Sequence, residues 1–134
     1  MWGTYQHSNL RIEMKASSDE IRRSLIQPSA LSQWLSPQSI ELGNSSVTPN
    51  VTQSRNLAVG QSFDSVLGPL RIHHTVDMLS EDGICFLLSE GIDGFHEWQW
   101  GDGWIQSRLE GVSLLPLNLG QTASILRLRH YLQA

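Results

Sequence analysis

Alternating apolar and polar side chains mark the first regular element of the chain. Between residues 8 and 16, apolar side chains occupy every second position and charged ones lie between them. Because successive side chains of a strand point to opposite faces, this alternation predicts a half-buried strand. Its apolar face carries Leu10, Ile12, Met14 and Ala16.

Two short helices are predicted directly after this strand. Residues 17–20, Ser-Ser-Asp-Glu, combine an N-cap residue with acids in the first turn. Pro28 occupies the favoured first-turn position of the second helix, and Pro37 ends it. The apolar sides of the two helices carry Ile21, Leu25 and Ile26, and then Leu31, Trp34 and Leu35.

Turn signals divide the remaining chain into strands. Residues 39–42 predict a second strand and the polar residues 43–58 a loop, and from Gly60 a strand–turn–strand pattern repeats four times. The four turns are Gly68-Pro69, residues 81–83, residues 92–94 and Asp102-Gly103.

The chain ends in a helical pattern. After Pro116 the spacing of apolar residues predicts a helix of about 15 residues, roughly 22 Å long. One stripe of this helix carries Leu119, Ala123, Leu126 and His130, and beside it lie Ile125, Leu128 and Leu132.

Turn length fixes the register of each hairpin, and register decides which side chains share a face. All four turns place the apolar side chains on the same face, which is good support for a single antiparallel sheet. The predicted rows on that face are Met78, Phe86, Trp100 and Ile105; Val76, Leu88, Trp98 and Ser107; and Phe63, His74, Glu90, His96 and Leu109. The third row stands out because it brings two histidines and a glutamate to the buried side.

The order of these elements resembles that of the START-like (SRPBCC) superfamily. The resemblance rests on the strand-to-helix entry at residues 16–21, on Pro28 with the Trp34-Leu35 pair, and on Gly60 with Phe63. Residues 94–104 also look like an SRPBCC protein class of photosynthetic bacteria that has no assigned activity. The match covers essentially the whole chain and implies a single domain, residues 1–134.

This resemblance implies an α+β helix-grip fold, in which a curved antiparallel sheet wraps around a long C-terminal helix. The superfamily includes lipid carriers, plant hormone receptors, polyketide cyclases and activators of a heat-shock chaperone. It therefore implies a cavity between sheet and helix, usually for an apolar ligand, and no particular chemistry. This chain departs from many members in its shorter C-terminal helix and in the long loop at 43–58.

Composition narrows the classes of partner. The net charge is −4 and Lys and Arg total 9, which disfavours nucleic acid and anionic membranes as main partners. Cys85 is the only cysteine, which suits a reducing cytosol, so a cytoplasmic protein is expected. The first residues carry no charged region followed by an apolar run, so no secretory leader is expected. The longest apolar stretch near the end is interrupted by Pro116, Asn118 and Gly120, so no transmembrane segment is expected, and no cofactor is implied.

The row of His74, Glu90 and His96 is the sharpest candidate for chemistry. Opposed side chains on neighbouring strands lie about 4.5–5.5 Å apart at Cβ, so Glu90 could bond both rings. The trio could recognise a polar ligand head, hold a metal or catalyse a reaction, or it could simply form the wet rim of the sheet. His73 and His74 cannot share a metal, because adjacent strand residues point to opposite faces.

Other candidate groups carry less chemistry. Cys85 and Ser89 are predicted on the outer face, and Ser107 a row away from the histidines, so no catalytic triad is predicted. Arg127 and Arg129 are expected on a solvated face of the last helix. The residues predicted to line a ligand cavity are Phe63, Ile72, His74, Val76, Phe86, Leu88, Glu90, His96, Trp98, Trp100, Ile105, Leu109 and Leu126.

Three functions remain open from sequence. The first is a binding module for a small apolar or amphipathic molecule, with the trio facing its polar end. The second is a cyclase-like or hydrolytic enzyme that uses the same cavity, and the third is a protein-interaction domain whose cavity is too small for a ligand. Neither the ligand nor the oligomeric state follows from the sequence.

Overall fold

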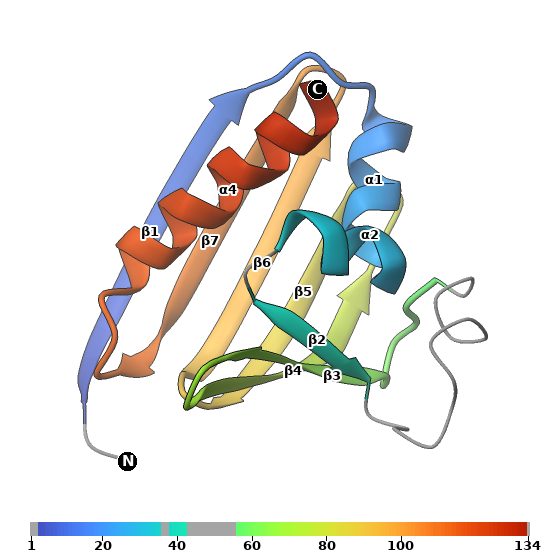
Figure 1. Cartoon of the computed structure of the whole chain (residues 1–134). Coiled ribbons are helices and arrows are strands. Elements are labelled where there is room, and N and C mark those ends of the chain that lie inside the picture. The colour runs from blue at the N-terminus through green and yellow to red at the C-terminus, as the bar shows by residue number, and fades with distance from the viewer. Residues whose placement is uncertain (1–2, 36–37, 43–55, 134) are drawn as a thin grey trace.

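The computed structural model describes residues 3–35, 38–42 and 56–133, which form one seven-stranded antiparallel sheet and three helices (Figure 1). The strands are β1 (Thr4–Glu13), β2 (Ser39–Leu42), β3 (Ser62–Leu67), β4 (Leu70–Leu79), β5 (Gly83–Glu90), β6 (Asp93–Gly101) and β7 (Trp104–Ser113). The helices are α1 (Ser18–Ile26), α2 (Pro28–Trp34) and α4 (Leu117–Gln133). Most of the predicted loop at 43–58 lies outside the described residues.

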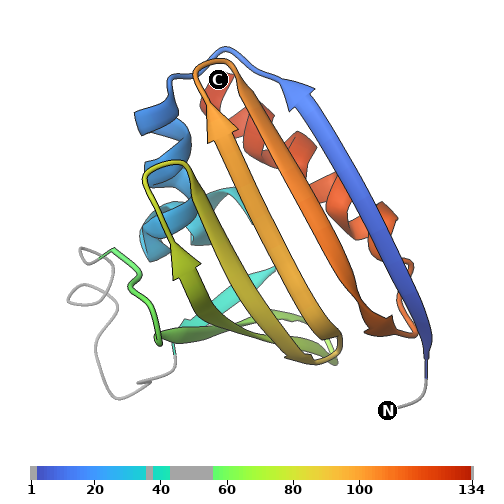
Figure 2. The same cartoon turned by 180° about the vertical axis from the view of Figure 1, so that it is seen from behind.

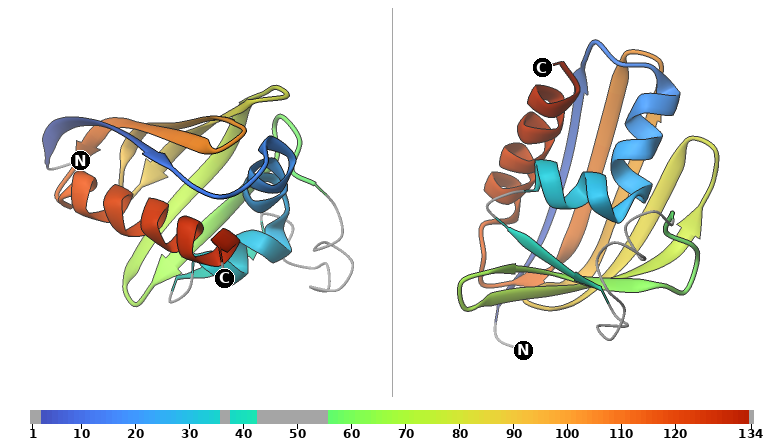
Figure 3. Two further views of the ribbon diagram at one scale, coloured as in Figure 1. Left: turned by 90° about the horizontal axis from the view of Figure 1, so that it is seen from above. Right: turned by 45° about the vertical axis from the view of Figure 1, so that its right-hand side comes forward.

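The sheet curves around its helices. The strand order is β1-β7-β6-β5-β4-β3-β2, and all three helices lie on the concave face, so none of the described helices covers the opposite face (Figure 2). Helix α4 lies over β1 and β7, and β2 to β4 turn across the lower end of the sheet beneath α2 (Figure 3). The predicted α+β helix-grip architecture is confirmed, with a C-terminal helix of 17 residues rather than about 15.

Local signals explain the two short helices. Ser17 and Glu20 form a reciprocal capping box, in which each side chain accepts a hydrogen bond from the other residue's backbone N–H. Pro28 begins α2, as predicted. The Trp34 indole N–H donates to the Ser24 carbonyl oxygen at 2.8 Å and so ties the two helices together.

Two of the four predicted hairpin registers are confirmed. Across β6 and β7, Trp98 lies opposite Ser107 and Trp100 opposite Ile105. Across β3 and β4, Phe63 lies opposite His74. Both hairpins have two-residue turns, and a turn this short leaves the strands a single register.

The predicted register between β4 and β5 is wrong. His74 lies opposite Leu88 instead of Glu90, and the ladder shifts between Val76 and Met78. Leu79 pairs with Ile84, so four residues separate the last pair, one more than predicted, and the irregularity after Val76 adds the second residue of the slip. Met78 consequently lies on the outer surface, 62% exposed, and not in the first apolar row.

The predicted register between β5 and β6 is also wrong. Each residue of β5 lies opposite a residue of β6 that is four positions earlier than predicted. Phe86 lies opposite His96 and Leu88 opposite Gly94. The turn lies earlier than predicted, because Glu90 adopts a left-handed backbone with a φ of 72°. The two ladders are shifted by two and by four residues. Because side chains alternate between faces every residue, an even shift leaves the apolar side chains of β5 and β6 facing the helices.

Helix α4 presents a different side to the sheet from the stripe singled out by sequence. Its buried residues are Leu117, Gln121, Ile125 and Leu128, whereas Leu119 and Leu126 are 65% and 41% exposed. Strand β1 sets this rotation. The Gln6 side chain accepts from the Leu117 N–H at 3.0 Å, and the Gln121 amide donates to the Ser8 carbonyl oxygen at 3.1 Å. In the described part of the chain no helix is long and apolar enough to cross a membrane.

Candidate ligand pocket

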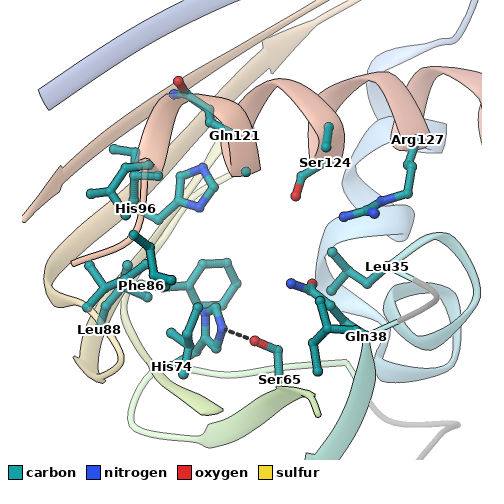
Figure 4. A pocket seen from close by; sticks show the side chains of 18 of the residues that line it. Leu35, Gln38, Ser65, His74, Phe86, Leu88, His96, Gln121, Ser124 and Arg127 are labelled. Atoms are coloured by element: carbon teal, nitrogen blue, oxygen red, sulfur yellow. Dashed lines mark hydrogen bonds between the residues drawn. The ribbon is translucent and has the colours of Figure 1, made fainter. Parts of the chain in front are cut away.

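A pocket of about 350 Å³ lies between the concave face of the sheet and helices α2 and α4 (Figure 4). Most of its lining is apolar. The apolar side chains come from all three helices, from β3 to β7 and from the β7–α4 connection. The polar ones are Gln38, Ser65, His74, His96, Gln121, Ser124 and Arg127.

The predicted cavity residues fall into three groups. Those that line the pocket are Phe63, Ile72, His74, Phe86, Leu88, His96, Trp98 and Leu109. Val76, Trp100 and Ile105 are buried but do not line it, because they belong to the packed part of the core. Glu90 and Leu126 are exposed and lie outside it, which corrects their predicted inward placement.

The predicted row of His74, Glu90 and His96 does not form. Glu90 ends β5 opposite Ile72, and its side chain is exposed. The two histidines nevertheless both reach the pocket, His74 from β4 and His96 from β6 (Figure 4). The sequence correctly placed both rings on the inner face, and the register slips removed the carboxylate between them. Within the described residues, no three His, Cys, Asp or Glu side chains converge as a metal site would require.

His74 is held by stacking and by one hydrogen bond. Its ring stacks on Phe63 with a centroid distance of 4.5 Å and meets Phe86 edge-on. Its Nε2 lies 3.0 Å from the Ser65 hydroxyl oxygen. Burial, reinforced by the neighbouring His73, lowers the pKa of His74 to about 3. The ring is therefore neutral at physiological pH.

His96 belongs to a buried polar network. Its Nε2 lies 2.5 Å from the Ser107 hydroxyl oxygen, and the Gln121 amide donates to the same oxygen at 3.0 Å. Burial, together with the proximity of His74, lowers the pKa of His96 to about 3. Ser107 is fully buried and does not line the pocket. The bond from Gln121 to Ser107 therefore fastens α4 to β7, and the contact between Ser107 and His96 joins β7 to β6. Ser107 offers no nucleophile to a molecule in the pocket.

The opposite wall carries the groups that the sequence interpretation missed. Ser124 and Arg127 extend from α4, and Gln38 from the segment before β2, toward the same end of the pocket (Figure 4). Arg127 was expected on a solvated face. A signal for the true orientation was present, because Gly120, Ser124 and Arg127 follow a helical spacing in which small side chains leave room beside the sheet.

Comparisons with known proteins bear on the fold. No protein-family model matches the chain, and no curated protein matches it. Solved structures do. The Aha1 dimer structure from Colwellia psychrerythraea has a TM-score of 0.65 at 15% identity, over 95% of this chain and 96% of that one. Major latex-like protein 151 from Panax ginseng has a TM-score of 0.68 at 9% identity, over 96% and 95%.

A third similar structure is DynU16, a protein in the dynemicin biosynthetic locus. Its TM-score is 0.65 at 17% identity over 96% of this chain, which spans only 47% of DynU16. At these identities the likeness shows the fold alone. The chain therefore has the helix-grip fold that the order of its elements predicted.

Proposed function

We propose that this domain binds a small hydrophobic or amphipathic molecule in the pocket between the sheet and α4. The observation that supports this proposal is an apolar cavity of about 350 Å³ with a few polar groups on two opposite walls. Ligand sites commonly enclose roughly 300–1,000 Å³ and combine apolar lining with a few polar groups. The volume lies at the lower end of that range and therefore favours a compact ligand.

The histidines suit recognition better than acid–base chemistry. Both rings are neutral at physiological pH, because burial lowers the pKa of each to about 3. A general acid or base works best with a pKa near the operating pH. Neutral rings that already bond Ser65 and Ser107 offer their remaining polar edges to a ligand.

A matched pair of substitutions on α4 tests the proposal. Ser124 points into the pocket, whereas Thr122 on the same helix is exposed. We expect Ser124→Phe to fill the cavity and to weaken binding of an environment-sensitive apolar dye such as ANS by about tenfold or more. Thr122→Phe should leave dye binding unchanged. Fluorescence titration measures both, and circular dichroism confirms that both variants fold.

Native mass spectrometry provides the complementary test. We expect the protein purified from its own source to retain a stoichiometric small molecule, which solvent extraction then identifies by class. Dye binding that is equal in wild type, Ser124→Phe and Thr122→Phe, together with protein purified without any ligand, would contradict the proposal. That result would favour a role in contacting other proteins.

A further inference from the structure

The charge among the polar groups of the pocket lies at one end. Arg127 is the only charged side chain in the lining, and no Asp or Glu borders the cavity within the described residues. The histidines on the opposite wall are neutral. The cavity therefore carries one positive charge at one end and an uncharged apolar body beyond it.

Arg127 has no internal counter-ion in the described part of the chain. Its Nε is buried and has no hydrogen-bond partner there. None of the ion pairs among the described residues includes Arg127; they involve Arg71, His73 and Arg108. A buried donor without a partner costs free energy, and a guanidinium at the edge of an apolar cavity interacts strongly with any anion that reaches it.

Two further polar groups face the pocket at the end where Arg127 lies (Figure 4). Ser124 is one helical turn before Arg127, and its hydroxyl points into the cavity, while the Gln38 amide approaches from the α2 side (Figure 4). A guanidinium with adjacent hydroxyl and amide groups is well suited to a carboxylate, whose two oxygens can accept several hydrogen bonds at once.

We propose that the pocket selects a compact amphiphile with a carboxylate head, which Arg127 binds with help from Ser124 and Gln38 while the apolar walls hold its body. This inference rests on the proposed ligand-binding function and specifies its ligand class. A single cation matches a monoanionic carboxylate better than a dianionic phosphate. The net charge of the chain is −4, so the attraction is local to Arg127 rather than a property of the whole surface.

Matched probes that differ only in their heads test the inference. Decanoate, decanol and methyl decanoate share one apolar chain, and only decanoate carries a carboxylate. We expect wild-type protein to bind decanoate more tightly than either neutral probe, by about tenfold or more, as is typical for a charge-assisted hydrogen bond. Isothermal titration calorimetry at neutral pH and fixed ionic strength measures all three.

Variants of α4 assign the preference to one side chain. Arg127→Gln should abolish the preference for decanoate and leave decanol binding unchanged, and Arg127→Lys should restore part of it. Arg129→Gln is the control, because Arg129 lies on the same helix outside the pocket lining. It should change neither affinity.

The outcomes separate this inference from the proposed function. Equal affinity for the three probes, or an Arg127→Gln variant that loses decanoate and decanol to the same extent, would overturn the carboxylate preference and leave a general apolar site. Failure of wild-type protein to bind any of the probes or the dye would overturn the proposed function and the carboxylate preference together.

Discussion

The two ends of the concave face are built from the same sheet, yet one is filled and the other encloses a pocket. At the filled end, Trp100 and Ile105 from the sheet and Ile125 and Leu128 from α4 are all at most 1% exposed. At the other end, side chains of β3 to β5 and of the first turns of α4 line the cavity that lies between them. The strands supply large apolar side chains in both places.

The helix makes the difference. The half of α4 near its C-terminus contributes large apolar side chains to the common core, whereas its first half places Gly120, Ala123 and Ser124 along the cavity. Protein interiors pack densely wherever side chains can meet, so a run of small residues opposite a curved sheet leaves space. Both these small side chains and the charged Arg127 of the pocket lining therefore come from α4.

Isoleucines at the two ends provide the strongest test of this comparison. Ile105 is fully buried at the filled end, and Ile72 lines the pocket. We expect Ile105→Ala to lower the free energy of unfolding by about 3–5 kcal/mol, because it leaves a cavity in packed surroundings. Ile72→Ala enlarges a space that is already open and should cost about 2 kcal/mol or less. Urea denaturation measures both, and equal losses would contradict the comparison.

Acid should act chiefly through the histidines at the pocket end. The pKa of His74 is about 3 in the folded protein, against about 6.5 for an unperturbed histidine, so between these values the unfolded chain binds a proton that the folded chain does not. Stability is therefore fully present above about pH 6.5 and is lost as the pH falls toward 3. His96 adds to the loss in the same window.

Thermal unfolding between pH 7 and 5 measures this effect before most carboxyl groups titrate. His74→Phe keeps a flat ring against Phe63. It should lower by about one the number of protons that the chain takes up on unfolding, and so make the stability fall less steeply with pH. His130→Gln, at an exposed position near the end of α4, serves as the control. A His74→Phe variant whose melting temperature falls with pH as steeply as that of the wild type would refute this assignment.

Met78 tests the register itself, with the smallest expected effect. Its side chain is 62% exposed on the outer surface. We expect Met78→Thr to change the free energy of unfolding by less than about 0.5 kcal/mol, as is usual for surface positions. The register predicted from sequence places Met78 in the apolar row instead, and a loss of about 2 kcal/mol or more in urea denaturation would support that register.

Short local signals account for the parts of the structure that sequence predicted well. The capping box at Ser17 and Glu20, the proline at the start of α2 and the two-residue turns each act within a few residues. Alternation identified the inner face of each strand, so both pocket histidines were expected inside. The residues that lie opposite one another were predicted wrongly across β4 and β5 and across β5 and β6, where the predicted turns had three residues rather than two.

Three features were not predicted from local signals. The irregularity after Val76 and the left-handed backbone at Glu90 shifted two ladders and removed Glu90 from the histidines. The rotation of α4 brought Arg127 into the pocket. Gln6 accepts a hydrogen bond from the Leu117 N–H, and the Gln121 amide donates to the carbonyl oxygens of Ser8 and Ser107, so β1 and β7 hold α4 in this rotation.

The amino-acid sequence by itself therefore determined the order of elements and the inner face of the sheet, because periodicity, caps and tight turns are local properties of the chain. The helix-grip architecture was expected from the resemblance of that order to the START-like superfamily. The tertiary structure alone decided which residues lie opposite one another across β4 to β6, where the cavity opens and that Arg127 faces it. A helix with apolar residues on several sides has no preferred rotation of its own, and only packing against β1 and β7 selects one.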